Sequence, residues 1–252
     1  MSTSPSGKQR YRGGLVVVLF LLFSGCSKTT SEAIPDGGMP KSASLELLGD
    51  AVVGIETHND HGELLSSGYG FLVGNEGRIV TTAQLLAVAD CHDVTVLTES
   101  GRHTVEEVLH FDAARDLVLL MLEFSAGSAP KGLTFRDRVP VVGEPVWTMS
   151  RKGDSEATDW WTGMVSAVHF NDKTPVLVLA TAPLVPRSSG TPLIDSDGRV
   201  VAMITQTMRQ SETVSTGIPA SRIQGFLKEP ESRISIDQLR SQRRRQIATG
   251  TI

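Results

Sequence analysis

Residues 69–82 read YGFLVGNEGRIVTT, two short apolar runs joined by a polar loop. Tyr69–Val73 and Arg78–Thr82 are rich in β-branched and aromatic residues, as strands are. Gly74-Asn75-Glu76-Gly77 between them supplies the residues that tight turns require. This stretch therefore predicts two neighbouring antiparallel strands joined by a hairpin.

The same alternation of short apolar runs and turn residues extends in both directions along the chain, with little helical periodicity. The first group of runs is Val52–Ile55, Tyr69–Val73, Arg78–Thr82, Val94–Leu97, His103–Leu109 and Leu117–Leu122. The second group is Val146–Met149, Trp160–His169, Val176–Thr181, Thr191–Ile194, Val200–Thr205 and Thr216–Pro219. Many short strands with regular turns indicate an all-β sandwich or barrel. Two groups of six predict two six-stranded antiparallel β-barrels.

Composition limits what such a chain can bind. It has 252 residues, 40% of them hydrophobic, which is enough to bury a sizeable core. Its formal net charge of −4 lacks the basic excess that neutralises a phosphate backbone. Nucleic acid is therefore not an expected partner.

The N-terminus has the pattern of an export signal. Basic residues between positions 8 and 12 precede the apolar run Leu15–Phe23, which is too short to span a bilayer as a helix. Phe23-Ser24-Gly25-Cys26 then resembles a bacterial lipobox, in which the cysteine thiol is acylated. We expect residues 1–25 to be a lipoprotein signal peptide and Cys26 to be the lipid anchor. The alternative is that Cys26 is the first free thiol after an ordinary signal peptide.

The lipobox implies a location and an organisation. Ser27, the residue after the cysteine, is not acidic. This favours anchoring to the periplasmic face of the outer membrane, within the cell envelope. Residues 26–44 are rich in Ser, Thr, Gly and Pro and are expected to form a flexible tether. The folded domain should span 45–228, with barrel one at about 45–125 and barrel two at about 140–228. Residues 229–252, with Arg240 and three arginines at 243–245, are expected to form a mobile basic tail; attraction to an anionic surface is the alternative.

Several segments together resemble a known family. They are Gly70–Val73, Gly77–Gln84, Ala114–Leu120, Val142–Val146, Gly163–Ala167, Pro186–Leu193, Gly198–Ala202 and Gly217–Pro219. In this order they are similar to the trypsin-like serine proteases, in the HtrA/Deg branch, over about Ser44 to Leu227. The resemblance implies the trypsin-like double β-barrel. We expect no PDZ domain to follow this region.

The resemblance places three residues at the positions of the catalytic triad. Ser189 falls at the nucleophile position and Asp116 at that of the orienting carboxylate. Gln84 falls where the family has its histidine. A serine hydroxyl needs a base to take its proton, and a carboxamide has no basic nitrogen to do so. We therefore expect proteolysis to be lost.

A second departure lies in the nucleophile loop. Arg187 stands where the family has a glycine, whose backbone N–H forms the oxyanion hole together with that of Ser189. A side chain with a Cβ resists backbone shapes that glycine adopts, so we expect this hole to be impaired. Thr191 also replaces a family glycine.

Other candidate residues have ordinary interpretations. His92 is the nearest substitute base, but it lies beyond the strand that carries Gln84. His58 and His61 have a spacing seen in metal sites without a third ligand nearby, so we expect neither a metal nor a cofactor. Cys91 is expected to be a small buried residue rather than a reactive thiol. Trp160 and Trp161 should point to opposite faces of one strand, one into the core and one outward as a possible contact residue.

These inferences converge on an exported, lipid-anchored homologue of HtrA-type proteases that is catalytically inactive. We expect it to bind peptides or protein partners at the cell envelope, through a strand edge that pairs with extended chains. One alternative is an active serine endopeptidase that uses Ser189 with a non-standard base. The other is a structural envelope protein with a filled cleft.

Overall fold

The computed structural model describes residues 48–88, 90–105, 107–124, 129–151, 158–182, 187–205, 215–239 and 241. The predicted signal peptide, Cys26, the tether and the four tail arginines lie outside these residues. Within the described part of the chain, no helix is long and apolar enough to cross a membrane.

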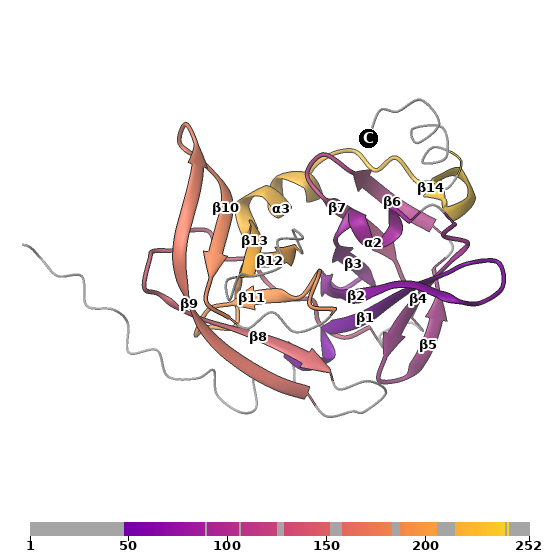
Figure 1. Ribbon diagram of the computed structural model, residues 1–252, viewed down its shortest axis with the longest axis horizontal. Coiled ribbons are helices and arrows are strands. Elements are labelled where there is room, and N and C mark those ends of the chain that lie inside the picture. Colours follow the sequence, from indigo (N-terminus) through magenta and orange to yellow (C-terminus); the bar gives the residue numbers. More distant parts are fainter. Residues whose placement is uncertain are drawn as a thin grey trace, which may run out of the picture. The chain divides into compact units, whose positions relative to one another are not determined.

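Seven strands of the first half of the chain, together with the C-terminal strand β14, form an eight-stranded antiparallel sheet in the order β14-β6-β7-β3-β2-β1-β4-β5 (Figure 1). Its strands are β1 (Val52–His58), β2 (Leu64–Val73), β3 (Arg78–Thr81), β4 (Asp93–Thr98), β5 (Gly101–Thr104), β6 (Glu107–Asp112), β7 (Leu117–Met121) and β14 (Ile234–Ser235). The predicted hairpin is present as β2 and β3, with Phe71 opposite Val80. The predicted strand His103–Leu109 is divided into β5, which pairs with β4, and β6, which pairs with β7.

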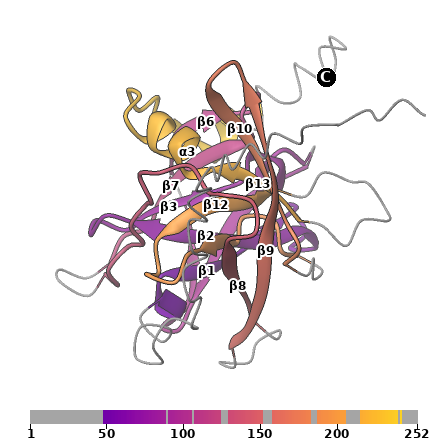
Figure 2. The same cartoon turned by 90° about the vertical axis from the view of Figure 1, so that its left-hand side faces the viewer.

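The second half forms a closed barrel in the order β10-β13-β12-β11-β8-β9. Its strands are β8 (Pro145–Arg151), β9 (Thr158–Asn171), β10 (Thr174–Ala180), β11 (Pro192–Ile194), β12 (Val200–Thr205) and β13 (Ser215–Pro219). Figure 2 shows β9 as a long, curved strand beside β8 and β10. The all-β double-barrel class predicted from the sequence is confirmed.

Alternation along β8 shows how the strands divide the core. Val146 faces the interior of the closed barrel, which is filled by small residues such as Val165 and Ala202. Trp147 and Met149 point the other way, into a larger core that also contains Phe71. Because successive side chains of a strand alternate between faces, β8 contributes to both cores. The larger core is thus shared between the two halves.

The linker between the halves is itself hydrogen-bonded to both. The Leu133 N–H donates to the Leu72 carbonyl at 2.8 Å, and the Arg136 N–H donates to the Val200 carbonyl at 3.0 Å. Between them, the Phe135 ring packs edge-on against Phe71 with centroids 6.1 Å apart. The linker is therefore an added strand-like segment that joins β2 to β12.

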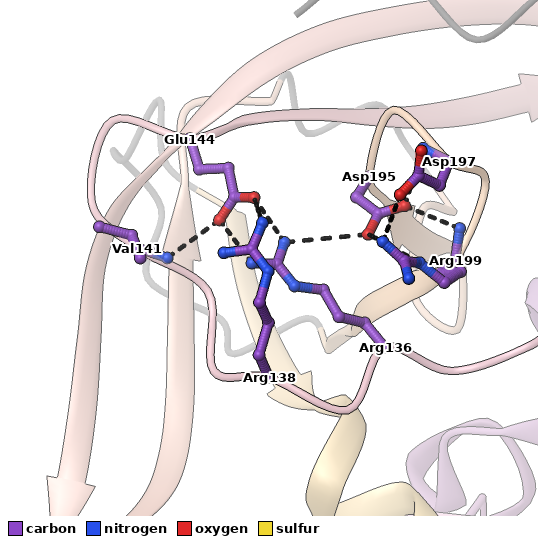
Figure 3. A network of polar contacts seen from close by, with 7 residues as sticks. All are labelled: Arg136, Arg138, Val141, Glu144, Asp195, Asp197 and Arg199. Atoms are coloured by element: carbon purple, nitrogen blue, oxygen red, sulfur yellow. Dashed lines mark hydrogen bonds and ion pairs between the residues drawn. The ribbon is translucent and has the colours of Figure 1, made fainter. Parts of the chain in front are cut away.

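A buried ion pair fixes the end of this linker (Figure 3). The Arg136 side chain is 1% exposed and makes a two-pronged pair with the Glu144 carboxylate, at 2.6 and 2.8 Å. Arg138 and the Val141 N–H also donate to Glu144, at 3.0 and 3.1 Å. Burial alone would raise the pKa of Glu144, but the hydrogen bonds from Arg136 and Val141 outweigh it and hold that pKa below its ordinary value.

The C-terminal segment differs from the predicted mobile tail. After helix α3 (Ala220–Leu227), the chain continues to pack on the first sheet, where β14 pairs with β6. Ile236 and Leu239 are buried in the larger core. The prediction gave weight to the arginines of this segment and overlooked these apolar residues, whose burial extends the folded region past residue 228.

Candidate functional site

Ser189, Asp116 and Gln84 lie together, although 73 residues or more separate Ser189 from the other two in sequence. Gln84 is the second residue of the short helix α2 (Ala83–Leu86), and Asp116 directly precedes β7. Gln84 Nε2 lies 2.9 Å from Ser189 Oγ and 3.3 Å from Asp116 Oδ2. The amide therefore bridges the hydroxyl and the carboxylate.

The direction of these hydrogen bonds follows from the chemistry of the groups. An amide nitrogen only donates and an ionised carboxylate only accepts, so Gln84 Nε2 must donate to Asp116. The opposite orientation of the amide would place its oxygen against the carboxylate oxygen. With the nitrogen facing inward, the same group donates to Ser189 Oγ, which therefore accepts from Gln84.

Asp116 is held by donors on three sides. Its Oδ1 accepts the Gln84 backbone N–H at 2.8 Å, and its Oδ2 accepts the Thr205 hydroxyl at 2.5 Å. Burial raises the pKa of Asp116 above its ordinary value, and the hydrogen bonds from Thr205, Gln84 and Ala83 only partly oppose this rise. Its backbone has a φ of 55°, a left-handed conformation that aspartate tolerates better than most residues do.

Ser189 is enclosed by a second hydroxyl. Thr82 Oγ1 lies 2.9 Å from Ser189 Oγ, and Thr82 is fully buried. Thr82 stands at the N-cap of α2, yet its side chain does not cap the helix. Ser189 as a whole is only 2% exposed. Its hydroxyl is thus engaged from the side of Thr82 as well as from that of Gln84.

The loop that carries Ser189 packs directly on β2. The Tyr69 N–H donates to the Ser189 carbonyl at 2.8 Å, and the Gly190 N–H donates to the Ile204 carbonyl at 2.7 Å. A Cβ on Gly68 would lie 2.7 Å from the Ser189 carbonyl oxygen. Close backbone contact on both sides therefore fixes this loop between the two halves.

Arg187 is exposed and has a φ of 70°. The expectation was that its Cβ would resist the conformations open to glycine, but the residue does adopt a left-handed one, which costs about 1–2 kcal/mol. Ser188 follows and is buried, with no hydrogen-bond partner for its hydroxyl among the described residues. Thr191 is likewise buried, and its backbone N–H donates to the Ser188 carbonyl at 3.1 Å.

The other candidates lie in ordinary surroundings. His92 pairs with the neighbouring Asp93 at 3.2 Å on the surface. His58 contacts Glu56 and His61 contacts Asp60, and no cluster of three metal-ligating side chains occurs among the residues that the structure describes. Cys91 is buried, and its Sγ lies 3.9 Å from the Asp93 carbonyl oxygen.

The two adjacent tryptophans differ in exposure. Trp160 packs against the larger core, whereas Trp161 is 36% exposed.

Thr82 and Thr205 were not identified as parts of the site from the sequence. Thr82 lies two positions before Gln84, and Thr205 ends β12. A threonine beside a strand end has no distinctive pattern, since β-branched residues are common in strands for packing reasons. Only the three-dimensional arrangement shows that their hydroxyls contact Ser189 and Asp116.

Comparison with known proteins identifies the family of this chain. A family model described as "Trypsin-like peptidase domain" matches residues 68–203, more than half of the chain. Serine protease HTRA1 of Xenopus laevis is 27% identical over 180 residues, which are 69% of this chain and 38% of that protein. Anti-sigma-I factor RsgI9 of Acetivibrio thermocellus is 28% identical over 205 residues, which are 79% of this chain and 27% of that protein.

Solved structures show the same fold. The Rv3671c protease of M. tuberculosis in its active form superimposes with a TM-score of 0.61 and 20% identity, covering 75% of this chain and 87% of that one. The curated relatives are longer proteins, of which this chain spans about a quarter to two fifths. The chain therefore belongs to the trypsin-like peptidase domain family and is similar to HtrA proteases.

Proposed function

We propose that this protein is a trypsin-like peptidase homologue without peptidase activity, which binds peptides or protein partners at the cell envelope. The observation that carries the proposal is the hydrogen bond from Gln84 Nε2 to Ser189 Oγ. A catalytic base must accept the serine proton, and here the group in that place donates one. Ser189 then stands at the nucleophile position with Asp116 behind an amide that cannot carry a proton between them.

The size of this effect decides between an impaired enzyme and an inactive one. In an unrelated serine protease, loss of the base alone lowers turnover on the order of a million-fold. We propose that Arg187 stands at an oxyanion-donor position, beside the Ser189 backbone, in a left-handed conformation that strains the loop without removing the N–H. The loss of the base alone leaves no useful hydrolysis.

Binding does not require the missing base. Domains of this shape can hold an extended peptide by backbone hydrogen bonds along a strand edge, which involves no proton transfer. The similarity to a protein named as an anti-sigma factor, beside several named as proteases, supports a role for this domain outside proteolysis.

The protein is expected to bind fluorescein-labelled reduced casein, used here as an extended polypeptide, without cleaving it. A fluorophosphonate probe should leave Ser189 unlabelled, because Ser189 Oγ accepts from Gln84 instead of donating to a base. Fluorescence anisotropy measures the binding, gel electrophoresis the cleavage, and in-gel fluorescence the labelling.

Three variants serve as controls for this experiment. Gln84→His should restore little cleavage, since Thr82 still engages Ser189 and Arg187 remains in place. Arg187→Glu changes the charge of an exposed residue beside the site and should weaken casein binding. Labelling that disappears in Ser189→Ala would instead favour the alternative, an endopeptidase with a non-standard base. Absence of casein binding would favour the structural envelope protein.

We also propose that the protein is anchored through Cys26 in the outer membrane, facing the periplasm. Small residues before a cysteine after an apolar run support acylation at this position. Cys26→Ala is expected to move the protein from the detergent phase to the aqueous phase in a phase-partition assay. Unchanged partition of that variant would contradict the anchor.

A further inference from the structure

The turn that presents Asp116 depends on its neighbour Arg115. This turn joins β6 to β7, and the Asp112 carboxylate accepts both the Arg115 N–H, at 2.9 Å, and the Arg115 Nε–H. The Asp116 N–H lies 3.4 Å from the Ala113 carbonyl. Because Asp116 has a φ of 55°, the turn must hold it in a conformation that it would otherwise rarely adopt. A shift of Arg115 would therefore move the backbone that carries Asp116.

The Arg115 guanidinium is bound in turn by the C-terminal segment. Both of its terminal nitrogens donate to the Glu229 carboxylate, each at 2.6 Å. The same guanidinium lies 5.6 Å above the centre of the Phe226 ring, which stacks on His110 at 4.6 Å. Hydrogen bonds from Arg115, and then from His110, lower the pKa of Glu229 to about 2. The Arg115 guanidinium and the Glu229 carboxylate are thus both charged at neutral pH.

The segment that carries Glu229 is itself firmly placed. Phe226 is 1% exposed, and the N–H groups of Ser232 and Arg233 both donate to the Leu109 carbonyl, at 2.9 and 3.0 Å. Beyond them, Ile236 and Leu239 are buried. Glu229 therefore holds Arg115 against a fixed support, from α3 through β14, and not against a free tail.

We infer that Arg115 is a positioning residue for the Gln84–Ser189 site, and that Glu229 is the anchor through which the C-terminal segment sets the geometry of that site. The path runs from Glu229 to Arg115, through the turn to Asp116, and through the Gln84 amide to Ser189. Its meaning for partner binding depends on the proposed function, whereas the coupling itself does not. A partner that displaced residues 226–239 would remove the support of Arg115 and so loosen the Gln84–Ser189 site.

A second ion pair provides a matched control. Glu231 binds Arg78 of β3 at 2.7 Å and so also joins the C-terminal segment to the first sheet. The Arg78 and Arg115 side chains are equally exposed, at 26%. Among the described residues, the side chain of Glu231 binds Arg78 and Arg233 and not the turn that carries Asp116. Its loss should therefore weaken the packing of the segment without altering the site.

The test compares Glu229→Gln with Glu231→Gln in the full chain. In ¹⁵N-correlated NMR spectra, Glu229→Gln is expected to shift the side-chain NH₂ signals of Gln84, which report its bonds to Asp116 and Ser189. It should also weaken casein binding by about 5-fold, the lower end of ordinary coupling between sites. Glu231→Gln should leave the Gln84 signals in place and change the affinity less than about 2-fold. Glu229→Asp, which keeps the charge, should shift the Gln84 signals and weaken casein binding less than Glu229→Gln does.

The outcomes separate the two claims. Equal shifts in both Gln variants, or shifts in neither, would overturn the positioning role. Shifts confined to Glu229→Gln, in a protein that binds no casein, would support the positioning role and contradict the proposed function. If Glu229→Gln proves too unstable to fold, Glu229→Asp carries the same comparison, with a smaller displacement of the Gln84 signals expected and no displacement contradicting the inference.

Discussion

Gly190→Ala is expected to lower the free energy of unfolding by about 4 kcal/mol or more, which is exceptional for one methyl group. Gly190 has a φ of 86°, and a Cβ there would lie 1.8 Å from the Tyr69 carbonyl oxygen. That oxygen also accepts the Thr81 hydroxyl at 2.6 Å, so it cannot move aside without breaking another bond. Backbone would have to shift on both sides of the site. Urea denaturation followed by tryptophan fluorescence measures the loss.

Gly74→Ala separates the two causes of this effect, the left-handed backbone conformation and the steric clash of the new Cβ. Gly74 also has a positive φ, 69°, but nothing lies within 4 Å of the position of its Cβ. The substitution therefore carries the conformational cost alone, about 1 kcal/mol. Similar losses in the two variants would show that Gly190 is not pressed against Tyr69 and would contradict the packing of the Ser189 loop on β2.

Arg136→Met is expected to lower the free energy of unfolding by about 3–5 kcal/mol. The substitution keeps an unbranched side chain but leaves the Glu144 carboxylate, which is 8% exposed, without its two-pronged partner. Asp195, 3.9 Å from the same guanidinium, also loses a nearby positive charge. Removing one member of a buried pair is costly because the other remains charged in a poorly solvated place. The midpoint of urea denaturation reports the change.

Arg138→Met provides the comparison on the same carboxylate. Arg138 donates to Glu144 at 3.0 Å, but its side chain is 57% exposed. Because a solvated ion pair contributes little, its loss should lower the free energy of unfolding by less than about 1 kcal/mol. If Arg136→Met were as mild as Arg138→Met, the Arg136–Glu144 contact drawn in Figure 3 would not behave as a buried ion pair.

Much of the fold could be predicted from period-two patterning. The hairpin at 69–82 and most of the predicted runs coincide with strands because their apolar residues alternate between two buried faces. The break between β5 and β6 could not be foreseen, since the Val105 N–H bonds to Val94 of β4 just where the chain turns toward β7. The C-terminal strand was missed because Ile234 and Ser235 are too few to form a pattern.

The site could be predicted only as far as the family motifs extend. The structure brings together the three residues that the resemblance singled out, while their roles remain proposals. Thr82 and Thr205 contact Ser189 and Gln84 across 107 and 121 residues, respectively, and no local signal marks such distant pairs. The link from Glu229 to Arg115 spans 114 residues and was hidden for the same reason.

The linker at 132–136 determines how the molecule comes apart. Leu133 is hydrogen-bonded to β2 and Arg136 to β12. If either half unfolded, the other would therefore lose hydrogen bonds and expose apolar side chains of the shared core. The two barrels are consequently one cooperative folding unit, and a chain severed between them would yield fragments that each expose half of a common interior.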